Sequence, residues 1–154
     1  MRIVLQRVLR AAVTIDGEET RATGPGLAAL VGFGHGDGEK QADYLAAKMC
    51  ELRIFGDENR QMNRSLLDVG GDCLIVPNFT LYAAVKKGRR PSFTDSMEPA
   101  GASVLFDYFV ETVKAKGITV ETGKFGGDML VEISNDGPVT IILDSSEIMP
   151  LGKV

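Results

Sequence analysis

Two stretches of this chain repeat apolar residues at helical spacing, whereas the other apolar runs have the length and composition of β-strands. The first stripe spans residues 42–52. The second lies within residues 99–116, where Pro99 suits a first helical turn and Gly117 suits a helix end. The order of strands, helix, strand, helix and strands predicts an α+β fold, in which a mostly antiparallel, barrel-like sheet packs against two main helices.

Turn residues mark where the strand-like runs end. Asp16-Gly17 closes two neighbouring runs and is a strong hairpin signal. A third strand is expected to end near Ala22, ahead of a turn rich in glycine and proline. The other expected strands, in chain order, are residues 2–9, 11–15, 27–33, 72–82, 118–121, 129–134 and 139–143.

The composition predicts one globular domain over residues 1–154, because 44% of the residues are hydrophobic and 25% are charged. One histidine and two cysteines are too few for a structural zinc site, so we expect neither a metal nor a cofactor. The sequence carries no signal peptide and no apolar run long enough to span a membrane. We therefore expect a cytoplasmic protein without a membrane partner.

The net charge of -4 conceals one strongly basic segment. Four cations fall within five residues, at Lys86, Lys87, Arg89 and Arg90. A basic loop on an acidic body indicates a local contact with an anion rather than general coating of nucleic acid, so DNA is not an expected partner. On charge alone, a solvated loop without a binding role is the more frequent explanation.

A side chain that could act as a catalytic base is missing from the recognisable motifs. His35 is the single histidine and lies in a glycine-rich loop. No Gly-x-Ser-x-Gly turn accompanies it, which argues against a Ser-His-Asp triad. We therefore interpret His35 as structural or incidental.

The segment 77–81 places a proline, an amide and a hydroxyl in an otherwise apolar run. Proline within a strand indicates an edge or a bulge, where backbone N–H and C=O groups are free to meet a ligand. The residues alone also allow a plainer interpretation, with Thr80 as a β-branched strand residue and Asn78 as a turn former. That alternative stays open at this level.

The segment 135–140 contains Gly137-Pro138. Glycine has no side chain and proline has no N–H, so carbonyl oxygens are the main recognition groups that this dipeptide offers. Its composition is also that of an ordinary hairpin turn.

Five segments, in order along the chain, resemble the D-aminoacyl-tRNA deacylase family, and the match extends over about residues 1–145. They are residues 1–8, 79–82, 87–93, 122–125 and 135–140. The resemblance implies an enzyme that proofreads tRNA charging by hydrolysing the ester of D-aminoacyl-tRNA, and of glycine mischarged on tRNA(Ala), to free amino acid and tRNA. It also implies a homodimer that binds the 3′ end of aminoacyl-tRNA.

The resemblance also implies how the enzyme distinguishes D from L substrates. Gly137-Pro138 would form a Gly-cis-Pro turn that crosses the dimer interface and enters the partner's active site. Its carbonyl oxygens would hold the ammonium group of the substrate and leave no room for an L side chain. The resemblance places Arg7 beside this turn as its support.

The remaining site residues follow from the same resemblance. Thr80 is placed beside the scissile ester, Asn78 belongs to the substrate-binding set, and Phe125 with Met129 surrounds the terminal adenine. An aminoacyl ester is already activated, so a positioned water and backbone N–H donors at Phe79 and Thr80 are expected to suffice. Thr80 is expected to position the reaction or to join the oxyanion site, since no base is present to make it a nucleophile.

The basic loop then becomes a candidate contact for tRNA phosphates. One departure from the family concerns Pro77 and Asn78, where Ser-Gln is usual. A related branch that clears L-alanine from mischarged tRNA also departs there. That activity, and a non-catalytic dimeric protein that binds tRNA ends, are the alternative functions.

Overall fold

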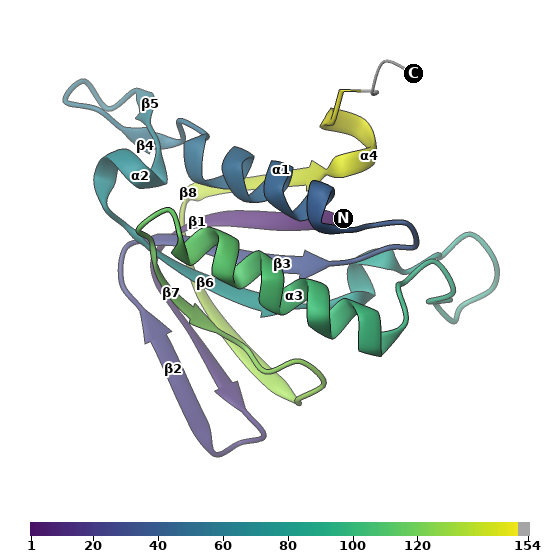
Figure 1. The fold of residues 1–154 in the computed structure, drawn as a ribbon. Coiled ribbons are helices and arrows are strands. Elements are labelled where there is room, and N and C mark those ends of the chain that lie inside the picture. Colours follow the sequence, from purple (N-terminus) through teal and green to yellow (C-terminus); the bar gives the residue numbers. More distant parts are fainter. Residues whose placement is uncertain (151–154) are drawn as a thin grey trace.

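One mixed sheet organises the chain, and the computed structural model describes residues 1–150 (Figure 1). The hydrogen-bonded order is β2-β1-β3-β6-β7. β8 also pairs with β1, along the edge that does not face β2 and β3. The strands of this sheet are β1 (Arg2–Ile15), β2 (Glu19–Thr23), β3 (Gly26–Gly32), β6 (Asp72–Pro77), β7 (Thr119–Thr122) and β8 (Met129–Asp144). The last four residues of the expected domain, 151–154, lie outside the described residues.

β1 is a single strand of 14 residues where two shorter strands were expected. Residues 2–8 pair with β3, residues 11–15 pair with β2, and β8 pairs along both parts. The register against β8 shifts between Gln6 and Val8 and again between Val8 and Arg10. The expected break near Arg10 is therefore an irregularity within one strand, which lets β1 change neighbours without ending.

Two pairings in the sheet are parallel, so the expectation of a mostly antiparallel sheet is only partly confirmed. β1 pairs antiparallel with β2, β3 and β8, whereas β3–β6 and β6–β7 are parallel. Each parallel pair is joined by a helical crossover, as parallel neighbours require. The two helices are α1 (Glu39–Glu51) and α3 (Pro99–Lys114), both close to their expected positions.

The sheet curves until its edge strands approach each other. Arg21 on β2 donates from Nη1 to the carbonyl of Thr122 on β7, at 2.8 Å. This side chain links the two edges, so the sheet forms a nearly closed barrel. Neither main helix, nor any shorter helix within residues 1–150, combines the length and hydropathy needed to span a bilayer.

Both main helices cover the same face of the sheet (Figure 1). Alternation along β6 shows how the two faces are filled, because Cys73 and Ile75 join the core beneath the helices while Leu74 and Val76 join a second cluster. The helix-side core contains Ile3, Leu5, Leu45, Met49, Leu105 and Phe109, all buried. The second cluster contains Val13 and Ile15, and the partly buried Met129 and Val131 pack against it.

The strand expected over residues 72–82 is wrong beyond Pro77. The chain turns there into η1 (Phe79–Tyr82), a short 3₁₀ helix. Pro77 has no N–H to continue the ladder, and the side chain of Asn78 accepts a hydrogen bond from the Thr80 N–H at the start of the new helix. Local side-chain capping therefore overrides the strand propensity of this segment.

The two strands expected over 129–134 and 139–143 are joined as β8. Gly137-Pro138 does not separate them but lies in a bulge within β8. Four short elements were not expected: β4 (Phe55–Gly56), β5 (Met62–Arg64), α2 (Leu66–Val69) and α4 (Ser145–Ile148). They are too short to produce a recognisable hydrophobic period.

Candidate functional site

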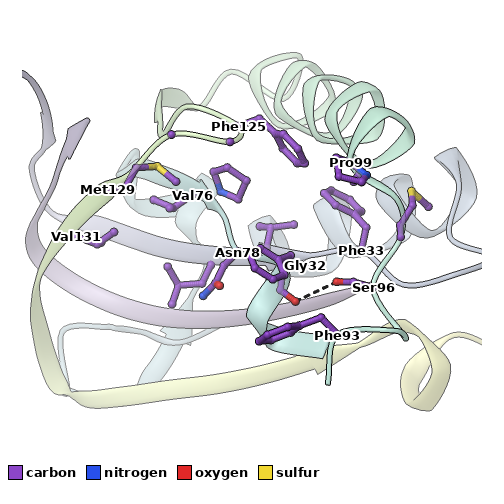
Figure 2. Close-up of a pocket in the computed structure, with 18 of the residues that line it drawn as sticks. Gly32, Phe33, Val76, Asn78, Phe93, Ser96, Pro99, Phe125, Met129 and Val131 are labelled. Atoms are coloured by element: carbon purple, nitrogen blue, oxygen red, sulfur yellow. Dashed lines mark hydrogen bonds between the residues drawn. The ribbon is translucent and has the colours of Figure 1, made fainter. Parts of the chain in front are cut away.

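A mainly apolar cavity of about 860 Å³ opens between the end of β6, the start of α3 and the start of β8. Figure 2 shows Met129 and Val131 on one side of it, Phe33 and Pro99 on the other, and Phe125 above Asn78. Polar groups in its wall include the side chains of Asn78, Ser96 and Glu98. A concave, mostly apolar site with a few polar groups is typical of a site for a small molecule or for part of a larger ligand.

The floor of the cavity contains the start of η1. Asn78 donates its N–H to the Val31 carbonyl at 2.7 Å, which ties the segment to β3. The Oδ1 of Asn78 accepts from the Thr80 N–H at 3.2 Å and from the Thr80 hydroxyl at 2.5 Å. The carbonyl of Phe79 accepts from the Ser96 hydroxyl at 3.1 Å, which fixes the next peptide group (Figure 2). Thr80 is therefore held beside the cavity by polar contacts on both sides of its backbone.

The N–H of Phe79 has no hydrogen-bond acceptor among residues 1–150. Its neighbours Asn78 and Thr80 both donate their N–H groups to protein acceptors. An unpaired backbone donor at the edge of a cavity is available for an oxygen atom of a ligand.

The far end of η1 is anchored by Arg2. Its Nη1 donates to the carbonyl of Leu81 at 3.0 Å, its guanidinium lies 4.5 Å from the centroid of the Tyr82 ring, and its Nε donates to Asp144 at 2.6 Å. Burial, followed by the nearby carboxylates of Asp37 and Asp144, raises the pKa of Tyr82 far above its usual value. The tyrosine is consequently neutral and does not supply a base.

The basic loop is followed by Phe93, which lines the cavity. Ala84 and Ser92 exchange backbone hydrogen bonds of 2.7 and 2.9 Å, which closes the loop at its base. Phe79 is 58% exposed, and its ring packs edge-on against Phe93 with the ring centroids 4.9 Å apart. The loop's four cations are exposed, and none of them belongs to an ion pair among residues 1–150.

Phe125 and Met129 both line the cavity. Phe125 packs near Phe106 of α3, with 6.4 Å between the ring centroids. A Cβ added at Gly123 would lie 2.6 Å from the Met129 sulfur, so a residue without a side chain allows this close packing. Pro77 also lines the cavity, which makes its wall apolar at the position where the family usually has serine.

Gly137 and Pro138 lie in a bulge of β8 outside this cavity. Val8 pairs with Asn135 and Gln6 pairs with Thr140, so the four residues 136–139 have no partners on β1. The Gly137-Pro138 peptide bond is cis, and Gly137 has a φ of +121°.

Arg7 lies beside the bulge. Its Nη1 donates to the Ile54 carbonyl at 2.7 Å, and its Nε lies 3.2 Å from the Asp136 carboxylate. That ion pair lacks hydrogen-bond geometry at Nε, which leaves this buried nitrogen without a hydrogen-bond partner. Arg7 therefore supports the bulge mainly by charge and by packing.

The expected catalytic and substrate-binding residues thus form two groups within one chain. Asn78, Phe79, Phe125 and Met129 line the cavity, with Thr80 next to them on η1. Arg7, Gly137 and Pro138 do not line it.

Sequence reasoning missed two residues that organise these groups. Ser96 has no sequence signal, because its contact with the Phe79 carbonyl joins two loops. Asn135 donates to the carbonyls of Arg7 and Val139 and so fixes the base of the bulge. Its place directly before a turn sequence was the available signal. No cluster of three or more His, Cys, Asp or Glu side chains suited to a metal ion occurs within residues 1–150.

Comparisons with known proteins agree over almost the whole chain. A family model described as D-Tyr-tRNA(Tyr) deacylase matches residues 4–144. D-aminoacyl-tRNA deacylases from Thermomicrobium roseum and Heliobacterium modesticaldum are 55% and 53% identical to this chain over 148 and 144 residues. The first alignment covers 96% of each chain, and the second covers 94% of this chain and 96% of the relative.

Two solved structures share the fold. A protein named c-Myc DNA Unwinding Element Binding Protein has a TM-score of 0.87 and 38% identity, covering 94% of this chain and 99% of its own. A probable eukaryotic D-amino acid tRNA deacylase has a TM-score of 0.81 and 19% identity, covering 92% of this chain and 97% of its own.

Proposed function

Because this chain belongs to the D-aminoacyl-tRNA deacylase family, we propose that it hydrolyses the ester bond of D-aminoacyl-tRNA. The products are the free D-amino acid and tRNA. The observation that carries the proposal is the cavity that brings Asn78, Phe79, Phe125 and Met129 together beside Thr80.

The terminal adenosine of the tRNA occupies the cavity in this proposal. Phe125 and Met129 contact the adenine, for which an aromatic ring and a polarisable sulfur are suitable partners. With the base held there, the ribose and its ester lie toward η1, within reach of the free Phe79 N–H. The Phe79 N–H shares its peptide group with the Asn78 carbonyl, which is held by a hydrogen bond of 3.4 Å from the Leu81 N–H. This backbone donor stabilises the oxyanion that forms when water attacks the ester carbonyl.

The reaction needs little help from side chains. Water adds its oxygen to the acyl carbon, the bond from that carbon to the ribose oxygen breaks, and the amino acid leaves as a carboxylate. One proton of the water ends on the ribose oxygen and the other enters solvent. Positioning and a single well-placed donor lower the barrier without a strong base.

Rejection of L substrates requires a second copy of the chain. We place Gly137 and Pro138 of the partner subunit at the cavity, where their carbonyl oxygens bind the substrate ammonium. Within one chain the bulge lies outside its own cavity. Support for association also comes from β8, whose outer edge has no partner strand within residues 1–150 and which carries the exposed Leu130 and Ile142.

The proposed Gly-Pro turn excludes an L side chain by steric contact at the α-carbon of the substrate. Glycine has no side chain and would not be excluded. We therefore include glycine mischarged on tRNA(Ala) among the substrates. The basic loop, residues 86–90, contacts phosphates near the tRNA 3′ end in this proposal, because its cations are exposed and the chain just beyond them reaches the cavity at Phe93.

The test is a deacylation assay with D-tyrosyl-tRNA, L-tyrosyl-tRNA, glycyl-tRNA(Ala) and L-alanyl-tRNA, corrected for spontaneous hydrolysis in buffer. The D-tyrosyl and glycyl esters should be cleaved and both L esters spared. Preferential cleavage of L-alanyl-tRNA would assign the chain to L-alanine clearance. Tight binding without turnover of any ester would make it a non-catalytic protein that binds tRNA ends.

A further inference from the structure

Asn78 contacts Thr80 twice through one atom. Its Oδ1 accepts from the backbone N–H and from the hydroxyl of Thr80, at 3.2 and 2.5 Å. The identity of this atom follows from chemistry, because the N–H of Thr80 can only donate and therefore requires an oxygen opposite it. An amide oxygen cannot donate, so the hydroxyl proton of Thr80 points at Asn78.

Asn78 is itself held by the sheet. Its backbone N–H donates to Val31, and its carbonyl accepts from the Leu81 N–H at 3.4 Å. A Cβ added at Gly32 would lie 2.9 Å from the Asn78 carbonyl oxygen, so β3 and this peptide are in close contact. Because β3 holds the backbone of Asn78 in place, the Asn78 side chain can set the orientation of Thr80.

The two hydrogen bonds determine what Thr80 can offer a substrate. The Thr80 N–H is already donated and does not serve the oxyanion, which leaves that role to the Phe79 N–H. The Thr80 oxygen retains lone pairs that can accept a hydrogen bond. Thr80 in this arrangement is an acceptor, whereas an oxyanion site requires a donor.

We propose that Asn78 is a positioning residue, which turns the Thr80 hydroxyl so that its oxygen accepts a hydrogen bond from the water that attacks the ester. The inference rests on the proposed function and deepens it. Thr80 orients the water and does not become covalently attached to the acyl group. The usual glutamine of the family has one more methylene, so the short amide of Asn78 is what allows this tight turn onto Thr80.

A direct contact between Asn78 and the substrate is the competing explanation, because its Nδ2 has no acceptor among the described residues and lies in the cavity wall. A double-mutant cycle separates the two explanations. The variants are Asn78→Ala, Thr80→Val and the double variant, each assayed with D-tyrosyl-tRNA. Asn78→Asp is the matched control, because it has the same length and keeps the acceptor oxygen.

Asn78→Ala is expected to lower kcat between about tenfold and a hundredfold while KM changes little, because small misplacement of a reacting group can cost that much. Asn78→Asp should recover most of the lost kcat. In the Thr80→Val background, Asn78→Ala should add almost nothing, because the group that it positions is gone. An equal loss in both backgrounds, or a loss expressed in KM, would overturn the inference.

Amide hydrogen exchange gives a readout that does not depend on turnover. The Thr80 N–H should be protected in the wild type and in Asn78→Asp, and should exchange faster in Asn78→Ala. The Leu74 amide in β6 reports whether the sheet remains folded. A wild type that hydrolyses no ester would overturn the proposed function, whereas an active Asn78→Ala variant with wild-type kcat would overturn only this inference.

Discussion

Asn135 and Arg7 are joined by a hydrogen bond of 3.0 Å from the Asn135 side-chain nitrogen to the Arg7 carbonyl. The same nitrogen donates to the Val139 carbonyl at 3.0 Å, so one amide spans the base of the β8 bulge. Its oxygen accepts from Gln6 and Thr140, each at 3.3 Å. Asn135 therefore sets how Gly137 and Pro138 project from the sheet.

Asn135→Ala should weaken both stability and chiral selection. Loss of these contacts should lower the free energy of unfolding by about 1 to 3 kcal/mol, since two backbone carbonyls lose their partner. The ratio of kcat/KM for D- over L-tyrosyl-tRNA should fall more than kcat/KM for the D ester. Gln6→Ala is the control, because it removes one hydrogen bond to Asn135 and keeps both carbonyl contacts. An unchanged D-over-L ratio in Asn135→Ala would show that the bulge holds its shape without the amide.

Gly137→Ala should damage the bulge directly. The φ of +121° is strained for alanine, and the added Cβ would lie 2.9 Å from Val139 Cγ2 and 3.1 Å from Arg7 Nη2. Strain of this kind costs about 1 to 3 kcal/mol. The methyl group would also enter the space assigned to the substrate α-carbon, so the D-over-L ratio should collapse.

Gly36→Ala is the matched control for this change. Gly36 also has a positive φ, at +82°, but no atom lies within 4 Å of its added Cβ. Urea unfolding and paired kcat/KM values for both esters should show a larger loss for Gly137→Ala in each measurement. Equal effects of the two substitutions would mean that backbone strain alone, rather than contact at the bulge, explains the result.

Neutralising the basic loop should weaken tRNA binding without unfolding the chain. With Lys86, Lys87, Arg89 and Arg90 changed to glutamine, each lost phosphate contact should reduce the log-log salt slope of binding by roughly 0.7 to 0.9. Fluorescence titration at several salt concentrations measures the slope. Lys40→Gln, at an exposed cation on α1, is compared with Lys87→Gln alone and controls for the loss of one positive charge elsewhere on the surface. A slope that does not change would leave the loop with no role beyond solubility.

Asp144 should make the stability of the fold sensitive to acid. Burial opposes its ionisation, but hydrogen bonds from Ser146 and Arg2 outweigh burial and hold the pKa of Asp144 below its usual value. The unfolded chain then binds the proton more tightly than the folded chain. The stability that Asp144 contributes is complete above its unfolded pKa and is lost as the pH falls through the folded pKa.

Asp144→Asn should therefore lower the free energy of unfolding at pH 7 and flatten its decline below about pH 4. Urea unfolding at several pH values measures both effects. Glu132→Gln removes an exposed carboxylate from the same strand and should leave the profile close to that of the wild type. An Asp144→Asn profile as steep as the wild-type profile would assign the acid sensitivity to other carboxylates.

The two main helices were predictable because the apolar residues around Leu45 and around Phe109 recur every three or four positions. In a helix, this spacing places them all on one face, which is buried in the core. Parallel pairing of β3 with β6 was not predictable from local pattern, because both strands are buried and apolar whichever neighbour they take. Pro77 indicated an interruption. The length of the strand before it and the 3₁₀ helix after it depended on where the Asn78 side chain found its donors.

The cavity residues came from family resemblance rather than from spacing. Asn78 and Phe125 are far apart in sequence, and the fold brings them to one wall through the parallel pair β6–β7. No local pattern could reveal that juxtaposition. The position of Gly137 outside this cavity was equally beyond local reasoning, because it depends on the register of β8 against β1.

The distance between bulge and cavity along one chain has a genetic consequence. In the dimer that we propose, two defective alleles, one altered at Gly137 and one altered at Thr80, each retain the part that the other has lost. The sound cavity of the first then receives the sound bulge of the second, so one intact site is assembled from two defective genes. Co-expression of the two alleles should restore D-selective hydrolysis that neither homodimer possesses.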